Sequence, residues 1–309
     1  MSNWYWLTAW LPSLLAIIGN GLVIYLIRSR PRLRTLQNRF VLSLAIADFC
    51  VGTCYYPGHV ICNFLLDSKC NVMIRDDIAV YMIYSSVSNL CAMAIDRYIA
   101  IVRPLRYLTL MTTTRAKILT TIAWMIPMVV YFIPAICVSL KLFSINFKIS
   151  VVIWTTIFEF IPCTLLLFAT MQVIIISKRH RRRDANFSQL TLRQKASTSV
   201  IGSVVAIFLL CYAVEVYSSF CHFTSLCTPH DNIYNAVRFL IIVNSAANPI
   251  AYALFKRDMK RELDKLICKN SFTKPSLLSR RSNERSTSLW VITTAYLRKK
   301  TDTAAFSEF

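Results

Sequence analysis

The chain has 309 residues, of which 56% are hydrophobic and only 16% are charged. Its 35 Lys and Arg residues outnumber its 15 Asp and Glu residues, which gives a formal net charge of +20. A soluble domain carries about 25% charged residues, and a disordered chain has low hydrophobicity, so the composition excludes both classes. It also argues against a nucleic-acid partner, because apolar blocks separate the basic residues. The composition predicts a membrane protein.

Seven stretches of the chain are long and apolar enough to cross a bilayer. A bilayer core about 30 Å thick needs about 20 consecutive, mostly apolar residues in a helix, because lipid cannot pair with free backbone groups. The fold class expected is therefore an all-α membrane protein with a seven-transmembrane helix bundle. The stretches are residues 1–27, 40–66, 78–95, 118–140, 149–177, 196–229 and 232–255.

The basic residues lie almost entirely on one side of these stretches. Thirty of the 35 fall between alternate pairs of stretches or after the last one. Because Lys and Arg near span ends favour the cytoplasm, we predict an extracellular amino terminus and a cytoplasmic carboxyl terminus. The predicted location is the plasma membrane, as a multi-pass protein.

The carboxyl-terminal part changes character after the last stretch. We assign residues 1–255 to the bundle. Apolar residues at helical spacing against a basic face predict an amphipathic membrane-surface helix over 256–268, with membrane lipid as its partner. Cys268 is either a palmitoylation site or a plain buried thiol. Residues 269–309 are basic and rich in Ser and Thr, which predicts a disordered cytoplasmic tail.

The eleven cysteines contain no paired zinc-binding knuckles. Cys221 and Cys227 flank a short segment at the outer end of the sixth stretch. Oxidation is allowed outside the cell, so we predict a disulfide between them.

Polar side chains inside the apolar stretches form a series of motifs. An ionisable or amide residue is costly in a bilayer, so its presence there indicates a function. The motifs, in chain order, are Asn20, Leu44-Ala45-Ile46-Ala47-Asp48, Asp96-Arg97-Tyr98, Trp124, Pro162, Phe208-Leu209-Leu210-Cys211 and Asn244-Ser245-Ala246-Ala247-Asn248-Pro249-Ile250-Ala251-Tyr252. Together they resemble the rhodopsin-like (class A) G-protein-coupled receptors over residues 5–268. The similarity to melanocortin and amine-type receptors is distant, and no subfamily matches closely.

The resemblance implies an activation apparatus at the cytoplasmic end. Asp96 would hold Arg97 in the resting state, and Arg97 would face the G protein once the sixth helix moves outward. The alternative is an interfacial arginine that reaches lipid headgroups. The remaining residues implied in coupling and activation are Tyr98, Phe208, Tyr212, Asn248, Pro249 and Tyr252.

The resemblance also implies a polar pocket in the middle of the bundle, which in many members holds a sodium ion as an allosteric modulator. Its residues here are Asp48, Ser86, Asn244 and Asn248. Oxygen ligands around one carboxylate suit such an ion. The alternative is a protonated Asp48 that is hydrogen-bonded to Asn20 and Asn248. No other cofactor is expected.

Several family features are altered, among them a motif of the sixth helix and a disulfide of the third. Where the family usually has Cys-Trp-x-Pro, this chain has Tyr212 and Val214 in place of the tryptophan and the proline. Without that proline the expected cause of a helix kink is missing. The family disulfide at the top of the third helix is also in question, because Cys70 lies two residues early and residues 141–150 contain no cysteine. Whether Cys70 forms a disulfide stays open.

By the resemblance, the ligand binds in the outer half of the bundle. Surplus carboxylates there favour a cationic or zwitterionic ligand, although an internal ion pair between Glu215 and Arg238 would cancel the attraction. Ala79 stands where aminergic receptors place their amine-binding aspartate, so an ordinary monoamine mode is disfavoured. The expected ligand-binding residues are Asp76, Ala79, Glu159, Glu215 and Arg238.

The expected function is a receptor that couples an extracellular small ligand to a heterotrimeric G protein. The ligand would be an amine-like molecule, a short peptide or a lipid mediator. A receptor kinase and arrestin are further partners expected at the Ser- and Thr-rich tail. The protein is not expected to be an enzyme. The alternative function is an ion-coupled transporter or channel that uses the intramembrane carboxylates.

Overall fold

The structure is a computed structural model, and it describes residues 3–62, 70–142, 147–183, 205–206, 208–219, 221 and 231–271. Within these residues every regular element is helical. The chain divides into two compact units, residues 1–261 and 262–309. The candidate membrane spans all lie in the first unit. The domain boundaries that the sequence suggests after residues 255 and 268 stay predictions.

The helices follow one another along the chain with short connections. The first group is α1 (Asn3–Ser29), η1 (Pro31–Leu33), α2 (Leu36–Cys54), α3 (Tyr56–Val60), α4 (Val72–Val102), η4 (Pro104–Arg106) and α5 (Tyr107–Leu110). The second group is α6 (Thr113–Pro127), η5 (Met128–Phe132), α7 (Ile133–Ser139), α8 (Phe147–Thr155), η6 (Thr156–Phe160), α9 (Ile161–Arg183), α11 (Asp231–Phe255) and α12 (Arg257–Ser271).

Six of the helices in the described residues are long and apolar enough to cross a membrane. They correspond to six of the seven predicted stretches, and the apolar helix Phe208–Ser219 is the described part of the remaining one. The prediction of an all-α membrane protein is therefore confirmed. The six spans are Trp10–Ser29, Leu36–Val60, Val72–Val102, Thr113–Ser139, Ile149–Ile176 and Ala236–Leu254.

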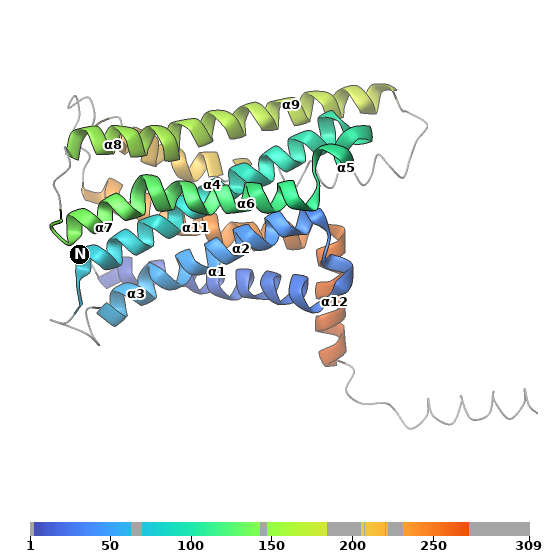
Figure 1. The fold of residues 1–309 in the computed structure, drawn as a ribbon. Coiled ribbons are helices and arrows are strands. Elements are labelled where there is room, and N and C mark those ends of the chain that lie inside the picture. Colours follow the sequence, from blue (N-terminus) through green and yellow to red (C-terminus); the bar gives the residue numbers. More distant parts are fainter. Residues whose placement is uncertain are drawn as a thin grey trace, which may run out of the picture. The chain divides into compact units, whose positions relative to one another are not determined.

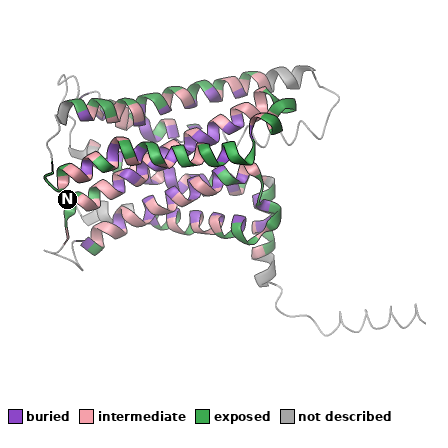
Figure 2. Ribbon diagram, viewed as in Figure 1, coloured by how far each residue is buried: buried purple, intermediate pink, exposed green. Residues whose placement is uncertain are grey.

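Helix α4 is the most buried of these spans. It packs against α2, α6 and α9, while α1 packs against α2 and α11 (Figure 1). In the apolar window of α4, 61% of the residues are buried, compared with 22% in the span formed by α6, η5 and α7. Figure 2 shows exposed residues along α6 and α9, and the exposed residues Ile122 and Phe168 are apolar, as a lipid-facing surface requires. Residues of α4 therefore face the interior of the bundle.

Short polar residues fix where two of the spans begin. The Thr35 hydroxyl accepts a hydrogen bond from the Asn38 N–H at the start of α2. Asn71 accepts from the N–H groups of Met73 and Ile74 at the start of α4. Such caps satisfy N–H groups that have no partner in the first turn of a helix.

Two wide helical turns precede prolines. The π-helical segments η5 and η6 end shortly before Pro134 and Pro162. Proline has no N–H and its ring clashes with the carbonyl group four residues earlier, and in both cases that earlier residue lies inside the wide turn. Glu159 lies within η6 and is buried there, and π-turns are frequent at functional sites.

Helices α1 and α11 approach each other closely at one glycine. A Cβ atom on Gly19 would lie 2.8 Å from Cγ of Pro249. On the same side of α1, the Asn20 amide donates to the Ser245 carbonyl at 3.1 Å and to the Ala16 carbonyl at 2.9 Å. The small residue and the amide together hold α11 against α1.

We expect Gly19→Ala to lower the free energy of unfolding by about 1–3 kcal/mol, because the added methyl group overlaps the Pro249 ring. The measurement is thermal unfolding of the purified protein. Gly21→Ala is the matched control, since a Cβ there would meet Phe49 at an ordinary 3.6 Å. Equal unfolding temperatures for the two variants would contradict the packing described.

Candidate functional site

A buried ion pair lies at the inner end of α4. Nη2 of Arg97 is 2.8 Å from Oδ2 of Asp96, and both residues are buried. The Tyr107 hydroxyl donates a 2.7 Å hydrogen bond to Oδ1 of the same carboxylate. Burial, followed by the charge of Asp96, raises the pKa of Tyr107, so this hydroxyl stays protonated as a donor. Asp96 thus joins α5 to the arginine that the motif singled out.

A second basic residue belongs to this end of the bundle. Lys256 Nζ donates to Oδ1 of Asn38, whose amide nitrogen donates to the Leu33 carbonyl at 2.7 Å. Burial, and then the nearby charge of Arg97, lowers the pKa of the Lys256 ammonium to about 7. The sequence analysis did not identify Lys256, Asn38 or Tyr107. Lys256 and Asn38 are 218 residues apart, so only the packing of α2 against α11 brings them together.

The polar residues predicted in mid-bundle lie together. Asp48 is fully buried on α2. It accepts hydrogen bonds from the Ser86 hydroxyl at 2.5 Å and from the Asn248 amide at 2.7 Å. Oδ1 of Asn244 is buried and has no partner among the described residues. Asn20 bonds the backbone of α11 and not Asp48.

The motif residues of the sixth and seventh helices are also internal. Phe208 and Tyr212 are buried and stack with their ring centroids 4.2 Å apart. The Tyr252 hydroxyl is 3.7 Å from Sδ of Met93 on α4. Pro249 lies inside α11 against Gly19. Tyr98 is half-buried at the inner end of α4 and its ring lies 6.3 Å from that of Phe168.

Two carboxyl groups lie in the outer half of the bundle without full hydrogen bonding. Glu159 is only 4% exposed. Its Oε2 atom, like Oε2 of Glu215, is buried and has no hydrogen-bond partner among the described residues. The Glu159 carboxyl group is hydrogen-bonded to the Ser219 side chain. The ring of Tyr84 stacks on that of Phe158, with the centroids 4.1 Å apart.

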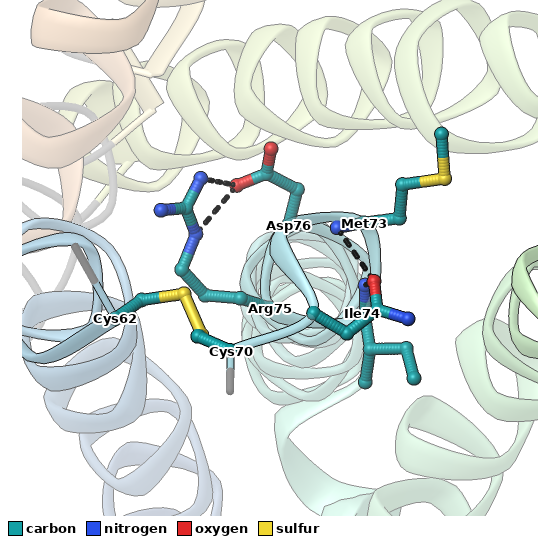
Figure 3. A network of polar contacts seen from close by, with 7 residues as sticks. Cys62, Cys70, Met73, Ile74, Arg75 and Asp76 are labelled. Atoms are coloured by element: carbon teal, nitrogen blue, oxygen red, sulfur yellow. Dashed lines mark hydrogen bonds and ion pairs between the residues drawn. A yellow bond between two sulfur atoms is a disulfide. The ribbon is translucent and has the colours of Figure 1, made fainter. Parts of the chain in front are cut away.

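The other predicted ligand residues are not grouped with this pair. Asp76 is exposed and pairs with Arg75 at 2.7 Å (Figure 3). Ala79 is buried, and Arg238 is exposed. Within the described residues no ion pair joins Glu215 to Arg238, although the two charges are close enough to attract each other. The ligand contacts predicted for these residues stay predictions.

Asp77 and a local disulfide lie at the outer end of α4, where the family usually has a disulfide to the second outer loop. Asp77 accepts hydrogen bonds from Ser139 at 2.7 Å and from Tyr131 at 3.2 Å, which ties α4 to η5 and α7. Cys70 forms a disulfide with Cys62, with 5.3 Å between the Cα atoms (Figure 3). Cys70 therefore does form a disulfide, and its partner is only eight residues away in the sequence.

The remaining cysteine predictions are only partly within the described residues. Cys221 is disulfide-bonded, but Cys227 lies outside the described residues, so the pairing of the two stays a prediction. The side chain of Cys268 is also outside them.

Comparison with known proteins agrees with this geometry. Residues 19–252 match the model of the 7 transmembrane receptor (rhodopsin family). This is more than half of the chain, and the chain therefore belongs to the rhodopsin family of seven-transmembrane receptors. Because its members are receptors and not enzymes, the protein is a signal-transducing class A receptor with several membrane passes.

The similarity to individual relatives is distant and spread over several kinds of receptor. The chain is 27% identical to octopamine receptor beta-2R of Chilo suppressalis, over 80% of this chain and 75% of the relative. It is 27% identical to adenosine receptor A2a of Canis lupus familiaris, over 86% of this chain and 73% of the relative. It is also 27% identical to trace amine-associated receptor 2 of Rattus norvegicus, over 81% of this chain and 80% of the relative. No close subfamily emerges, as the sequence motifs predicted.

Asp77→Ala should destabilise the protein by about 1–3 kcal/mol, because it leaves the partly buried hydroxyls of Tyr131 and Ser139 without their acceptor. Asp76→Ala, one residue earlier and exposed, should change the stability little, since its ion pair with Arg75 is at the surface. Thermal unfolding of both variants tests this difference. A larger loss of stability in Asp76→Ala than in Asp77→Ala would contradict the structural role given to Asp77.

Proposed function

We propose that this receptor sits in the plasma membrane and relays the binding of a small extracellular ligand to a heterotrimeric G protein in the cytoplasm. The family supports G-protein coupling in general. The observation that carries the specific proposal is the buried Asp96–Arg97 ion pair, held from a second side by Tyr107. A buried pair of this kind is sensitive to rearrangement, because removing either partner leaves an uncompensated charge.

The proposed orientation follows from the basic residues. Thirty of the 35 Lys and Arg residues lie on the side that contains Arg97 and the carboxyl tail. The proposed extracellular side then contains the outer end of α4 and the carboxyl pair. A receptor kinase and arrestin remain proposed partners of the tail, which lies outside the described residues. Palmitoylation of Cys268 and lipid contact of residues 256–268 are likewise proposals.

Activation is proposed as a shift between two states of the bundle. In the resting state Arg97 pairs with Asp96. In the active state the sixth helix moves outward with Phe208 and Tyr212, and Arg97 contacts the G protein. Tyr252 already lies beside α4 through Met93, which places it within reach of the same end of the helix. Tyr98, Asn248 and Pro249 would support this change.

The ligand proposed is a small cationic or zwitterionic molecule. Support comes from Glu159, which is buried, and from Glu215, which is half-buried; each has a buried Oε2 atom without a hydrogen-bond partner among the described residues. Two relatives also have names that refer to amines, the octopamine and trace amine receptors. Ala79 supplies no carboxylate, so the ligand would be bound differently from an ordinary monoamine. Asp76 and Arg238 are proposed only as outer contacts.

A sodium ion is proposed as a modulator in mid-bundle. The residues fit it, because the hydrogen-bond partners of Asp48 are neutral side chains, those of Ser86, Ser245 and Asn248. The Oδ1 atom of Asn244 also lacks a partner among the described residues. Carboxylate, hydroxyl and amide oxygens are ligands that hard cations accept. When bound, the ion would supply the positive charge that this buried carboxylate lacks.

Replacing Arg97 with Ala is expected to abolish recruitment of the G protein while the receptor still reaches the cell surface. Removing the guanidinium deletes the group proposed to face the G protein. The measurement is G-protein recruitment in cells, normalised to surface expression. Arg103→Ala removes an exposed arginine from the same end of α4 and should retain recruitment. Undiminished recruitment by Arg97→Ala would reject the assigned role.

Sodium chloride should raise the unfolding temperature of the purified receptor above its value in choline chloride of equal ionic strength, because binding to the folded state stabilises it. Asp48→Asn should remove the difference, and the exposed-carboxyl variant Asp258→Asn should keep it. Identical curves in the two salts for the unmodified receptor would show that Asp48 holds no sodium.

A further inference from the structure

The loop between α1 and α2, which faces the cytoplasm in the proposed orientation, contains five arginines and no lysine in residues 28–39. All of them except Arg30 are exposed. The chain has no acidic residue before Asp48, so no neighbour in the sequence offsets this charge. The loop is therefore a concentrated patch of positive charge, and its arginines are Arg28, Arg30, Arg32, Arg34 and Arg39.

The backbone of this loop is folded. Leu33, in η1, is only 1% exposed and anchors the turn in the bundle. The Leu33 carbonyl accepts a hydrogen bond from the Asn38 side-chain amide at 2.7 Å, and the Thr35 hydroxyl accepts one from the Asn38 N–H at 3.3 Å. The arginines therefore extend from a fixed turn, which lowers the entropy that is lost when several of them bind one ligand.

A further contact closes the loop on itself. Nη2 of Arg34 donates a 2.5 Å hydrogen bond to the carbonyl of Arg28, in the last turn of α1. Arg32 lies between these two residues, in η1. Within the residues that the structure describes, none of these three guanidinium groups forms an ion pair with a carboxylate. One short turn thus presents three exposed guanidinium groups to the membrane surface.

The choice of arginine indicates a phosphate partner. Orientation in the membrane requires an excess of positive charge, which Lys and Arg supply equally. A guanidinium presents a fixed fork of N–H donors that pairs with two phosphate oxygens at once, whereas an ammonium is a point charge. Clusters of about four to eight basic residues next to the cytoplasmic end of a span are typical of binding to anionic lipid headgroups.

We propose that this loop binds the multiply phosphorylated headgroup of an inositol lipid in the cytoplasmic leaflet, with Arg28, Arg32 and Arg34 as the phosphate-binding residues. This inference rests on the proposed orientation and assigns a ligand to a surface that the proposed signalling steps do not use. The acyl chains have an apolar path beside the site, because Tyr25, one turn before Arg28, and Ile18 are exposed on the membrane part of α1. A lipid with a single phosphate engages fewer of the three guanidinium groups.

The test uses the purified full-length receptor in a neutral detergent, without a G protein. The probe is the water-soluble dioctanoyl form of phosphatidylinositol 4,5-bisphosphate, and its binding is measured by calorimetry. Dioctanoyl phosphatidylserine, matched in total headgroup charge, should bind at least about tenfold more weakly, because it forms fewer forked phosphate contacts. Inositol 1,4,5-trisphosphate, which has no acyl chains, should also bind more weakly than the bisphosphate lipid.

Variants that keep the charge separate a phosphate site from a charge that only orients the protein. Arg28→Lys combined with Arg32→Lys removes two guanidinium forks and should weaken binding of the bisphosphate lipid at least about tenfold. Arg103→Lys combined with Arg106→Lys is the matched control at exposed arginines of the second inner loop and should bind the lipid normally. Both double variants should keep the unfolding temperature of the unmodified receptor, because all four side chains are exposed.

The inference is overturned if phosphatidylserine at matched charge binds as tightly as the bisphosphate lipid, or if the two double variants bind that lipid equally. Equal affinity for inositol trisphosphate would overturn the assignment to a lipid. The proposed coupling is judged separately, by G-protein recruitment in cells. Normal recruitment without lipid binding would reject the inference alone, and the expected lipid binding without recruitment would reject the coupling alone.

Discussion

The hydrogen bonds that Asp48 accepts from Ser86 and Asn248 join α2, α4 and α11 at one fully buried carboxylate. A charged or polar group in the interior of a membrane protein must find its partners within the protein, because lipid offers none. This requirement fixes the rotation of each helix about its own axis. Once Asp48, Ser86 and Asn248 face one another, the apolar residues on the opposite sides face lipid. The rest of the bundle depends on that arrangement.

The buried charges of the bundle fall into two kinds. Asp48 accepts hydrogen bonds on both carboxylate oxygens, while Asp96 accepts one on Oδ1 and forms an ion pair with Arg97 through Oδ2. The carboxyl groups of Glu159 and Glu215 each keep one oxygen unpartnered in the described residues. The satisfied groups lie in mid-bundle and at the inner end, and the unsatisfied pair lies in the outer half.

Other residues and local interactions stand where this chain lacks two features of the usual family pattern. The Cys62–Cys70 disulfide is a local link just before α4, while Asp77 ties that helix to η5 and α7 by hydrogen bonds. Likewise, Tyr212, whose ring stacks on Phe208, stands at the position where the family usually has a tryptophan. The outer end of α4 is thus fixed to its neighbours without a covalent bond to the second outer loop.

The sequence by itself determined the class of fold and the receptor family, because lipid demands long apolar stretches and the motifs occupy fixed places within them. It also identified Asp48, Arg97 and Asn248, since each is a costly group inside or at the end of a span. Only the tertiary structure decided which groups meet: Lys256 with Asn38, and Asp77 with Ser139. Such pairings depend on how far each helix is rotated and shifted, and residue spacing along one chain carries no record of that.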